Sequence, residues 1–113
     1  MQYGQVETFC LSLKGAVSDR PFGPSLQTFK IAGKIFAILS DDGGLTIKLS
    51  DVAYEVLLEL GRMRRAPYLP RGGWANTQDI TDWDEAELSD LIVRSYEQVV
   101  AGLTKKTRAE LGL

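Results

Sequence analysis

The chain has 113 residues, the size of one ordinary domain, and its hydrophobic fraction of 44% and charged fraction of 25% are those of a globular protein. It contains no histidine and a single cysteine, Cys10, which excludes an internal disulfide, a histidine-based triad and the commonest metal ligand. The formal charge of −2 at pH 7 excludes a uniformly cationic surface but leaves room for a local basic patch.

Targeting signals are not evident in the sequence. The first residues lack the basic and apolar regions of a secretory signal, and the longest apolar run, residues 35–39, is too short to cross a bilayer. We therefore expect one domain over residues 1–113, located in the cytoplasm and not attached to a membrane.

The first segment is predicted to be an amphipathic helix, because Val6, Phe9, Cys10 and Leu13 recur at helical spacing. Gly15 is expected to end this helix, and residues 21–24 form a loop. Cys10 lies on the apolar stripe. Core packing is favoured there over a reactive thiol, which needs an exposed, electropositive setting.

Residues 28–49 are predicted to form a three-stranded antiparallel meander. Gly33-Lys34 suits a two-residue type II′ turn, and Asp42-Gly43 suits a type I′ turn. Both turns place the same six apolar residues on one face: Phe29, Ile31, Phe36, Ile38, Ile47 and Leu49. The opposite face carries Thr28, Lys30, Ala37, Thr46 and Lys48. Lys30, Ala37 and Lys48 fall in one row, so the two lysine side chains start about 10 Å apart.

The second half is predicted to contain two helices and two short strands. Ser50 or Asp51 caps a helix that ends at Gly61, with Ala53, Val56, Leu57 and Leu60 on its buried side. Residues 66–69 and 74–80 form strands around a loop at 70–73. Asp82 and Glu85 form a capping box for the last helix, whose buried stripe is Leu88, Leu91, Ile92, Ser95, Val99 and Leu103. The polar tail, 104–113, either frays or adds a short helix. The predicted order is α-β-β-β-α-β-β-α, an α+β fold.

Catalytic and metal sites are not predicted. The acidic residues between Asp79 and Asp90 lack the spacing of a calcium loop, and they suit the start of a helix. Gly33-Lys34 lacks the glycine-rich phosphate-loop pattern, and Ser95-Tyr96 lies inside the last helix, where packing is expected. We therefore expect no enzymatic activity, no cofactor and no metal.

Basic residues are the remaining candidates for function. They fall in three groups: Lys30, Lys34 and Lys48 on the meander; Arg64, Arg65 and Arg71 around the second hairpin; and Lys105, Lys106 and Arg108 near the end. Such residues either neutralise phosphates or merely keep the surface soluble, and the sequence leaves both interpretations open. Trp74 either stacks on a base or seals the edge of the core.

A series of short motifs in the chain resembles the YjbR/MmcQ family of small bacterial proteins. The motifs are CLSLKG at 10–15, PFGP at 21–24, FKIAGKIFA at 29–37, the strand around Lys48, PYL at 67–69, Trp74, SY at 95–96 and LTKK at 103–106. The resemblance implies a CyaY-like "double-wing" α+β domain, related in shape to bacterial frataxins, with helices packed on one face of an antiparallel sheet. It also implies DNA binding.

Two hypotheses follow. The first is a non-enzymatic DNA-binding domain that contacts backbone phosphates through its lysines and arginines, with the hairpins acting as wings; phosphate contacts would not by themselves specify a base sequence. The second is a protein-interaction module that uses the same groove or the edge of the sheet.

Overall fold

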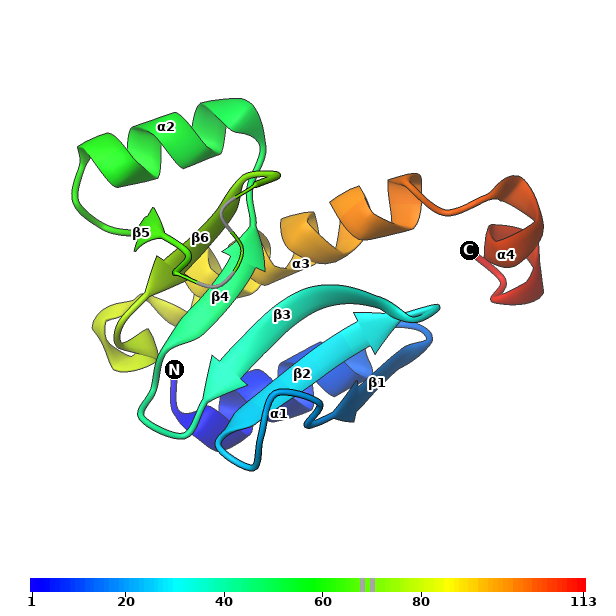
Figure 1. Cartoon of the computed structure of the whole chain (residues 1–113), viewed down its shortest axis with the longest axis horizontal. Helices are drawn as coiled ribbons and strands as arrows, with labels where there is room; N and C mark the ends of the chain where they lie inside the picture. The colour runs from blue at the N-terminus through cyan, green and yellow to red at the C-terminus, as the bar shows by residue number, and fades with distance from the viewer. Residues whose placement is uncertain (68, 70) are drawn as a thin grey trace.

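An antiparallel sheet with two helices packed against it forms the centre of the structure. The structure is a computed structural model, and it describes residues 1–67, 69 and 71–113. The elements are α1 (Tyr3–Ser12), β1 (Ala16–Asp19), β2 (Leu26–Ile31), β3 (Lys34–Ser40), β4 (Leu45–Lys48), α2 (Asp51–Glu59), β5 (Arg64–Arg65), β6 (Trp74–Thr77), a 3-10 turn (Ile80–Asp82), α3 (Glu85–Ala101) and α4 (Lys105–Glu110). The strand order in the described sheet is β1-β2-β3-β4-β6-β5, and α1 and α3 lie behind it (Figure 1). The predicted α+β class is confirmed.

The structure contains two elements, β1 and α4, that are not in the predicted order of helices and strands. β1 pairs with β2 at the edge of the sheet, and the prediction missed it because its one large apolar residue, Val17, is 58% exposed. The tail forms the short helix α4, which the Thr104 hydroxyl caps by accepting a hydrogen bond from the N–H of Thr107 at 3.1 Å.

The register of the first hairpin differs from the prediction by one residue. Its two-residue loop is Ala32-Gly33, and both residues have positive φ, 51° and 77°, as a type I′ turn requires. Ile31 therefore lies opposite Lys34, and Phe29 lies opposite Ala37. Our assumption that Gly33 must be the first loop residue was wrong, because Ala32 accepts the left-handed conformation.

The register of the β3–β4 hairpin also differs from the prediction by one residue. Its loop has three residues, 41–43, closed by a hydrogen bond from the Ser40 N–H to the Gly44 carbonyl at 2.8 Å, with Gly43 at φ 95°. Ile38 lies opposite Thr46 instead of Ile47, so it leaves the helix-covered face, and Ala37 enters the core in its place. The predicted row of Lys30, Ala37 and Lys48 does not form.

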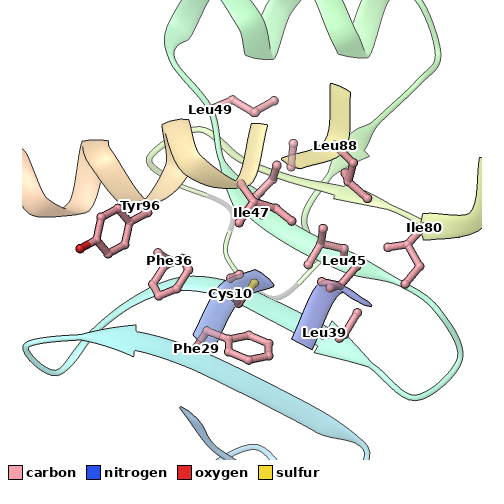
Figure 2. Close-up of a cluster of buried hydrophobic side chains, with 14 of the residues drawn as sticks. Cys10, Phe29, Phe36, Leu39, Leu45, Ile47, Leu49, Ile80, Leu88 and Tyr96 are labelled. Atoms are coloured by element: carbon pink, nitrogen blue, oxygen red, sulfur yellow. The ribbon is translucent and has the colours of Figure 1, made fainter. Parts of the chain in front are cut away.

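A β-bulge keeps Phe36 in the core despite these shifts. Lys30 pairs with Ile35 and Phe29 with Ala37, which leaves Phe36 as the extra residue of β3. The Phe36 ring is fully buried, and it meets Tyr96 edge to face at 5.4 Å between ring centres (Figure 2). The predicted burial of Phe36 is confirmed, although its strand partners differ.

The sheet forks beyond this bulge. β3 and β4 pair over residues 37–39 and 45–47, and their other ends diverge (Figure 1). The buried hydroxyl of Ser95 on α3 lies at the fork, where it donates a hydrogen bond to the Phe36 carbonyl (2.6 Å) and accepts one from the Lys48 N–H (2.9 Å). Ser95 therefore bridges the first half of the sheet (β1, β2, β3) and the second half (β4, β6, β5), and its predicted structural role is confirmed.

The helix boundaries agree with the sequence in part. The Ser50 hydroxyl caps α2, as predicted, by accepting from the Ala53 N–H. The cap of α3 is Asp84 rather than Asp82, because residues 80–82 form the 3-10 turn. The buried stripe predicted for the last helix is confirmed: Leu88, Ile92 and Ser95 are buried on α3, Leu91 and Val99 pack against the core, and Leu103 is buried just after α3 ends.

Two predictions in the middle of the chain were wrong. β5 comes before residues 66–69, while Tyr68 and Pro70 lie outside the described residues. Val56 and Leu60, expected on the buried side of α2, are 47% and 65% exposed, because α2 projects from the second half of the sheet with one side facing solvent (Figure 1).

Candidate functional site

Four exposed lysines surround the end of the molecule where α4 packs beside the β2–β3 hairpin. We call this surface the α4 end: Lys14, Lys34, Lys105 and Lys106. Lys14 Nζ donates a hydrogen bond to the Gly112 carbonyl at 2.9 Å, and Gly15 lies against Ile31 and Leu111. Among the residues that the structure describes, none of the four lysines has a carboxylate oxygen within 4.0 Å.

Acidic residues gather at the other end of α3. They are Asp79, Asp82, Asp84, Glu85, Glu87 and Asp90, all exposed. α3 has 17 residues, which is about 25 Å of helix, and α4 follows its C-terminus. Most of the charges that the sequence separates are therefore also separated in space, and the four lysines outnumber the one exposed carboxylate of α4, Glu110, so the α4 end is basic although the whole chain is slightly acidic.

The three lysines of the meander do not form one patch. Lys30 lies opposite Val17 and Ile35, and its ammonium is paired with Asp19 at 3.0 Å. Lys34 belongs to the α4 end. Lys48 lies opposite Trp74 in the second half of the sheet, on the far side of the fork. The expected lysine row was wrong because the register on which it depended was wrong.

The arginines around the β5–β6 hairpin do not form a cluster either. Arg64 and Arg65 are consecutive on a strand, so their side chains leave opposite faces, with Arg64 opposite Asn76 and Arg65 opposite Ala75. Arg71 is exposed in the β5–β6 connection. Trp74 is half-buried, so it belongs neither to the core nor to a freely exposed surface.

The second tryptophan, which sequence reasoning overlooked, is the buried one. Trp83 is 6% exposed and donates its Nε1–H to the Thr77 hydroxyl at 2.8 Å. The Arg62 guanidinium stacks on its ring at 4.1 Å and pairs with Glu87 at 2.7 Å. Arg62 is therefore held in a structural contact.

The open face of the sheet, which points away from α1 and α3, carries a cavity of about 680 Å³. Its floor and walls are Phe22, Leu26, Ile38, Ser40, Asp42, Gly44, Thr46, Arg64, Ala66, Pro67, Leu69, Asn76 and Gln78. Phe22 comes from the β1–β2 loop, and Pro67 and Leu69 come from the β5–β6 connection. Two loops far apart in sequence thus wall the same cavity, and no motif or periodicity predicts this arrangement.

A row of side chains fixes Arg64 in this cavity. Thr28, Ile38, Thr46, Asn76 and Arg64 lie opposite one another on successive strands. The Asn76 amide donates to the Leu45 carbonyl (3.3 Å) and the Thr46 hydroxyl (3.0 Å), and its oxygen accepts from Arg64 Nε (3.0 Å). The Thr28 hydroxyl is buried and has no hydrogen-bond partner among the described residues.

Asp42 supplies a fixed negative charge to the cavity. Its Oδ1 accepts from the Gly44 N–H at 3.0 Å. That bond, a bond with the Ser40 hydroxyl and the charge of Arg64 together lower the pKa of Asp42. The cavity thus contains one cation and one anion on an otherwise apolar or neutral surface.

In the described part of the chain, no three carboxylate or thiol side chains come together as a metal site would require, and no helix is long and apolar enough to cross a membrane. Cys10 is buried, and burial raises the pKa of its thiol to about 12, so the reactive thiolate is disfavoured. The structure supports the packing role that the sequence predicts for Cys10.

Comparisons with known proteins agree with the resemblance noted in the sequence. The chain is 33% identical over 90 residues to Uncharacterized protein YbdF of Escherichia coli O157:H7, which covers 76% of this chain and 74% of that protein. The crystal structure of Deinococcus radiodurans protein DR2400, a DUF419 domain, shares the fold with a TM-score of 0.87 at 22% identity, over 97% of this chain and 87% of that one. The YjbR family model matches residues 11–98, and the chain therefore belongs to the YjbR family.

Proposed function

We propose that this domain is a non-enzymatic DNA-binding module that contacts the phosphate backbone through the α4 end. The observation that supports the proposal is the separation of charge along α3, which leaves four exposed lysines together without ion-pair partners among the described residues. A local basic surface of this kind attracts a polyanion even when the net charge is slightly negative.

The expected binding is weak and non-specific. A few lysine–phosphate contacts give dissociation constants of about 10⁻⁴–10⁻⁶ M at physiological salt, and they position a protein without selecting a sequence. Lys48, Arg71 and Trp74, at the end of the second half of the sheet, would make a separate, smaller contact. The unpaired, buried Cys10 suits a reducing cytoplasm, where we propose that the domain works.

The salt dependence of binding to random duplex DNA tests this proposal. Each phosphate contact contributes about 0.9 to the slope of log affinity against log salt, so the Lys34→Ala, Lys105→Ala, Lys106→Ala triple variant should reduce the slope by up to about 2.7. Arg94→Ala is the control, because Arg94 is exposed near the acidic end and is paired with Asp90. Undetectable binding at low salt, or an unchanged slope in the triple variant, would rule out the proposal.

A second candidate function, protein interaction, is favoured by α2. Val52, Val56 and Leu60 follow one another at four-residue spacing, and they are 73%, 47% and 65% exposed. Asp51, Glu55 and Glu59 form an exposed acidic line beside this apolar stripe. A helical partner with an apolar stripe flanked by lysine or arginine would match both lines.

This candidate predicts a complex that survives nuclease and high salt, since apolar contacts are not screened. The triple variant Val52→Ser, Val56→Ser, Leu60→Ser should lose that partner while keeping the wild-type melting temperature, because all three side chains are exposed. A partner that disappears on nuclease treatment, or that binds the triple variant unchanged, would contradict the candidate.

A further inference from the structure

We propose that the cavity on the open face binds a small organic monocarboxylate with an apolar body, and that Arg64 holds its carboxylate group. The proposal is independent of DNA binding, because none of the four lysines of the α4 end lines the cavity.

The size and lining of the cavity suit such a ligand. Its volume of about 680 Å³ falls in the range of about 300–1,000 Å³ that is usual for small-molecule sites, which are mainly apolar with a few polar groups. Leu26 and Ile38 provide an apolar floor, while Phe22 and Leu69 provide apolar walls. Phe22 is 54% exposed, so a bound ligand would cover an aromatic surface that now faces solvent.

Arg64 supplies the carboxylate-binding group. Asn76 already fixes Nε, and Asn76 is itself fixed by Leu45 and Thr46, so the guanidinium is oriented before any ligand arrives. Within the described part of the chain, its two terminal nitrogens make no hydrogen bond or ion pair. Two parallel N–H groups match the two oxygens of a carboxylate, and a group oriented in advance loses little entropy on binding.

Asp42 limits the charge of the ligand. It lines the same cavity, and its lowered pKa keeps it ionised at neutral pH. A ligand with two negative charges, such as a phosphate monoester, would meet Arg64 and Asp42 together and be partly repelled. A single negative charge can pair with Arg64 and is repelled less by Asp42 than two charges are, so the site fits a monocarboxylate better than a phosphate.

The first experiment compares three probes that share one phenylethyl body: 3-phenylpropionate, its neutral amide and 2-phenylethyl phosphate. Titrations followed by amide NMR should give a dissociation constant for the acid of about millimolar, the range for a ligand of its size. The amide and the phosphate should each bind at least about tenfold more weakly. The acid should shift signals from residues that line the cavity. Equal binding of acid and amide, tighter binding of the phosphate, no binding of the acid up to about 10 mM, or shifts confined elsewhere would overturn the proposal.

The second experiment uses variants of Arg64 and a matched control. Arg64→Gln removes the charge and should weaken 3-phenylpropionate at least about tenfold, whereas Arg71→Gln removes an exposed charge outside the cavity lining and should leave affinity nearly unchanged. Arg64→Lys keeps the charge but loses the two parallel donors, so it should bind with intermediate affinity. Unchanged affinity in Arg64→Gln would overturn the assignment. DNA binding through the α4 end should persist in Arg64→Gln, so the two proposals can fail separately.

Discussion

The two faces of the sheet bury their side chains in different ways. The helix-covered face holds Phe29, Phe36 and Ile47 against α1 and α3, and the buried hydroxyl of Ser95 there has both a donor and an acceptor partner. The open face buries Thr28, Thr46 and Asn76 beneath loops, leaves the Thr28 hydroxyl without a partner among the described residues, and encloses a cavity. We infer that the first face supplies stability, while the second keeps space and polar groups for recognition.

The largest expected effect belongs to the helix-covered face. Phe36→Ala should lower the free energy of unfolding by about 3–5 kcal/mol, because it removes a fully buried ring from contact with Tyr96. Phe22→Ala is the counterpart on the open face and should cost much less, since Phe22 is 54% exposed. Urea denaturation of both variants checks this. Equal losses would contradict the assignment of stability to the helix-covered face.

A smaller loss is expected at the fork. Ser95→Ala should lower the free energy of unfolding by about 1–3 kcal/mol, because the Phe36 carbonyl and the Lys48 N–H lose their shared partner. Ser89→Ala on the same helix is the control, since Ser89 is half-buried and its hydroxyl donates to the Met1 sulfur, a weak acceptor, at 3.7 Å. A stability of Ser95→Ala equal to that of Ser89→Ala would show that the bridge contributes nothing.

Alkaline pH should also weaken the helix-covered face through Cys10. Its pKa is about 12 in the folded chain and 9.0 when unperturbed, so the folded state binds the proton more tightly. The protonated thiol therefore contributes its full share to the free energy of unfolding below pH 9. That share is lost as the pH rises toward 12, by up to about 1.4 kcal/mol per pH unit. Urea denaturation between pH 9 and 11 should show a steeper decline for the wild type than for Cys10→Ala. Parallel declines would contradict burial of the thiol.

The smallest expected effect has the opposite sign. Thr28→Val should be neutral or stabilise the fold by up to about 1 kcal/mol, because it replaces a buried hydroxyl that has no partner in the described structure with a methyl group. Thr46→Val should instead destabilise by about 1 kcal/mol, since the Thr46 hydroxyl accepts a hydrogen bond from Asn76. The two melting temperatures measure the contrast, and a destabilised Thr28→Val would indicate that its hydroxyl is satisfied in solution.

The register of the hairpins shows how far the sequence could predict the fold. Alternation and the glycine positions predicted the meander, and Phe29, Phe36 and Ile47 are in the core as expected. Each turn nevertheless admits two loop choices one residue apart, and only packing selects between them. The observed choices exchange Ile38 and Ala37 between the faces, and the bulge at Phe36 restores the core.

The candidate site was harder to predict because it depends on long-range arrangement. The α4 end includes Lys14, which stands alone in sequence and meets α4 through Gly112. The cavity depends on Phe22 and Leu69, which lie on different loops and carry no motif. Arg64 was predicted to act with Arg65, but strand geometry sends the two side chains to opposite faces.

The fork has a mechanical consequence. At Phe36 and Lys48 the two halves of the sheet are joined through a hydroxyl group on α3 instead of a direct backbone bond, so a shift of α3 by a fraction of a hydrogen-bond length would loosen that joint. Phe22 and Leu26 line the cavity from the first half, and Arg64 and Leu69 line it from the second. We therefore expect the position of α3 to influence the angle between the two halves, and with it the width of the cavity that both halves line.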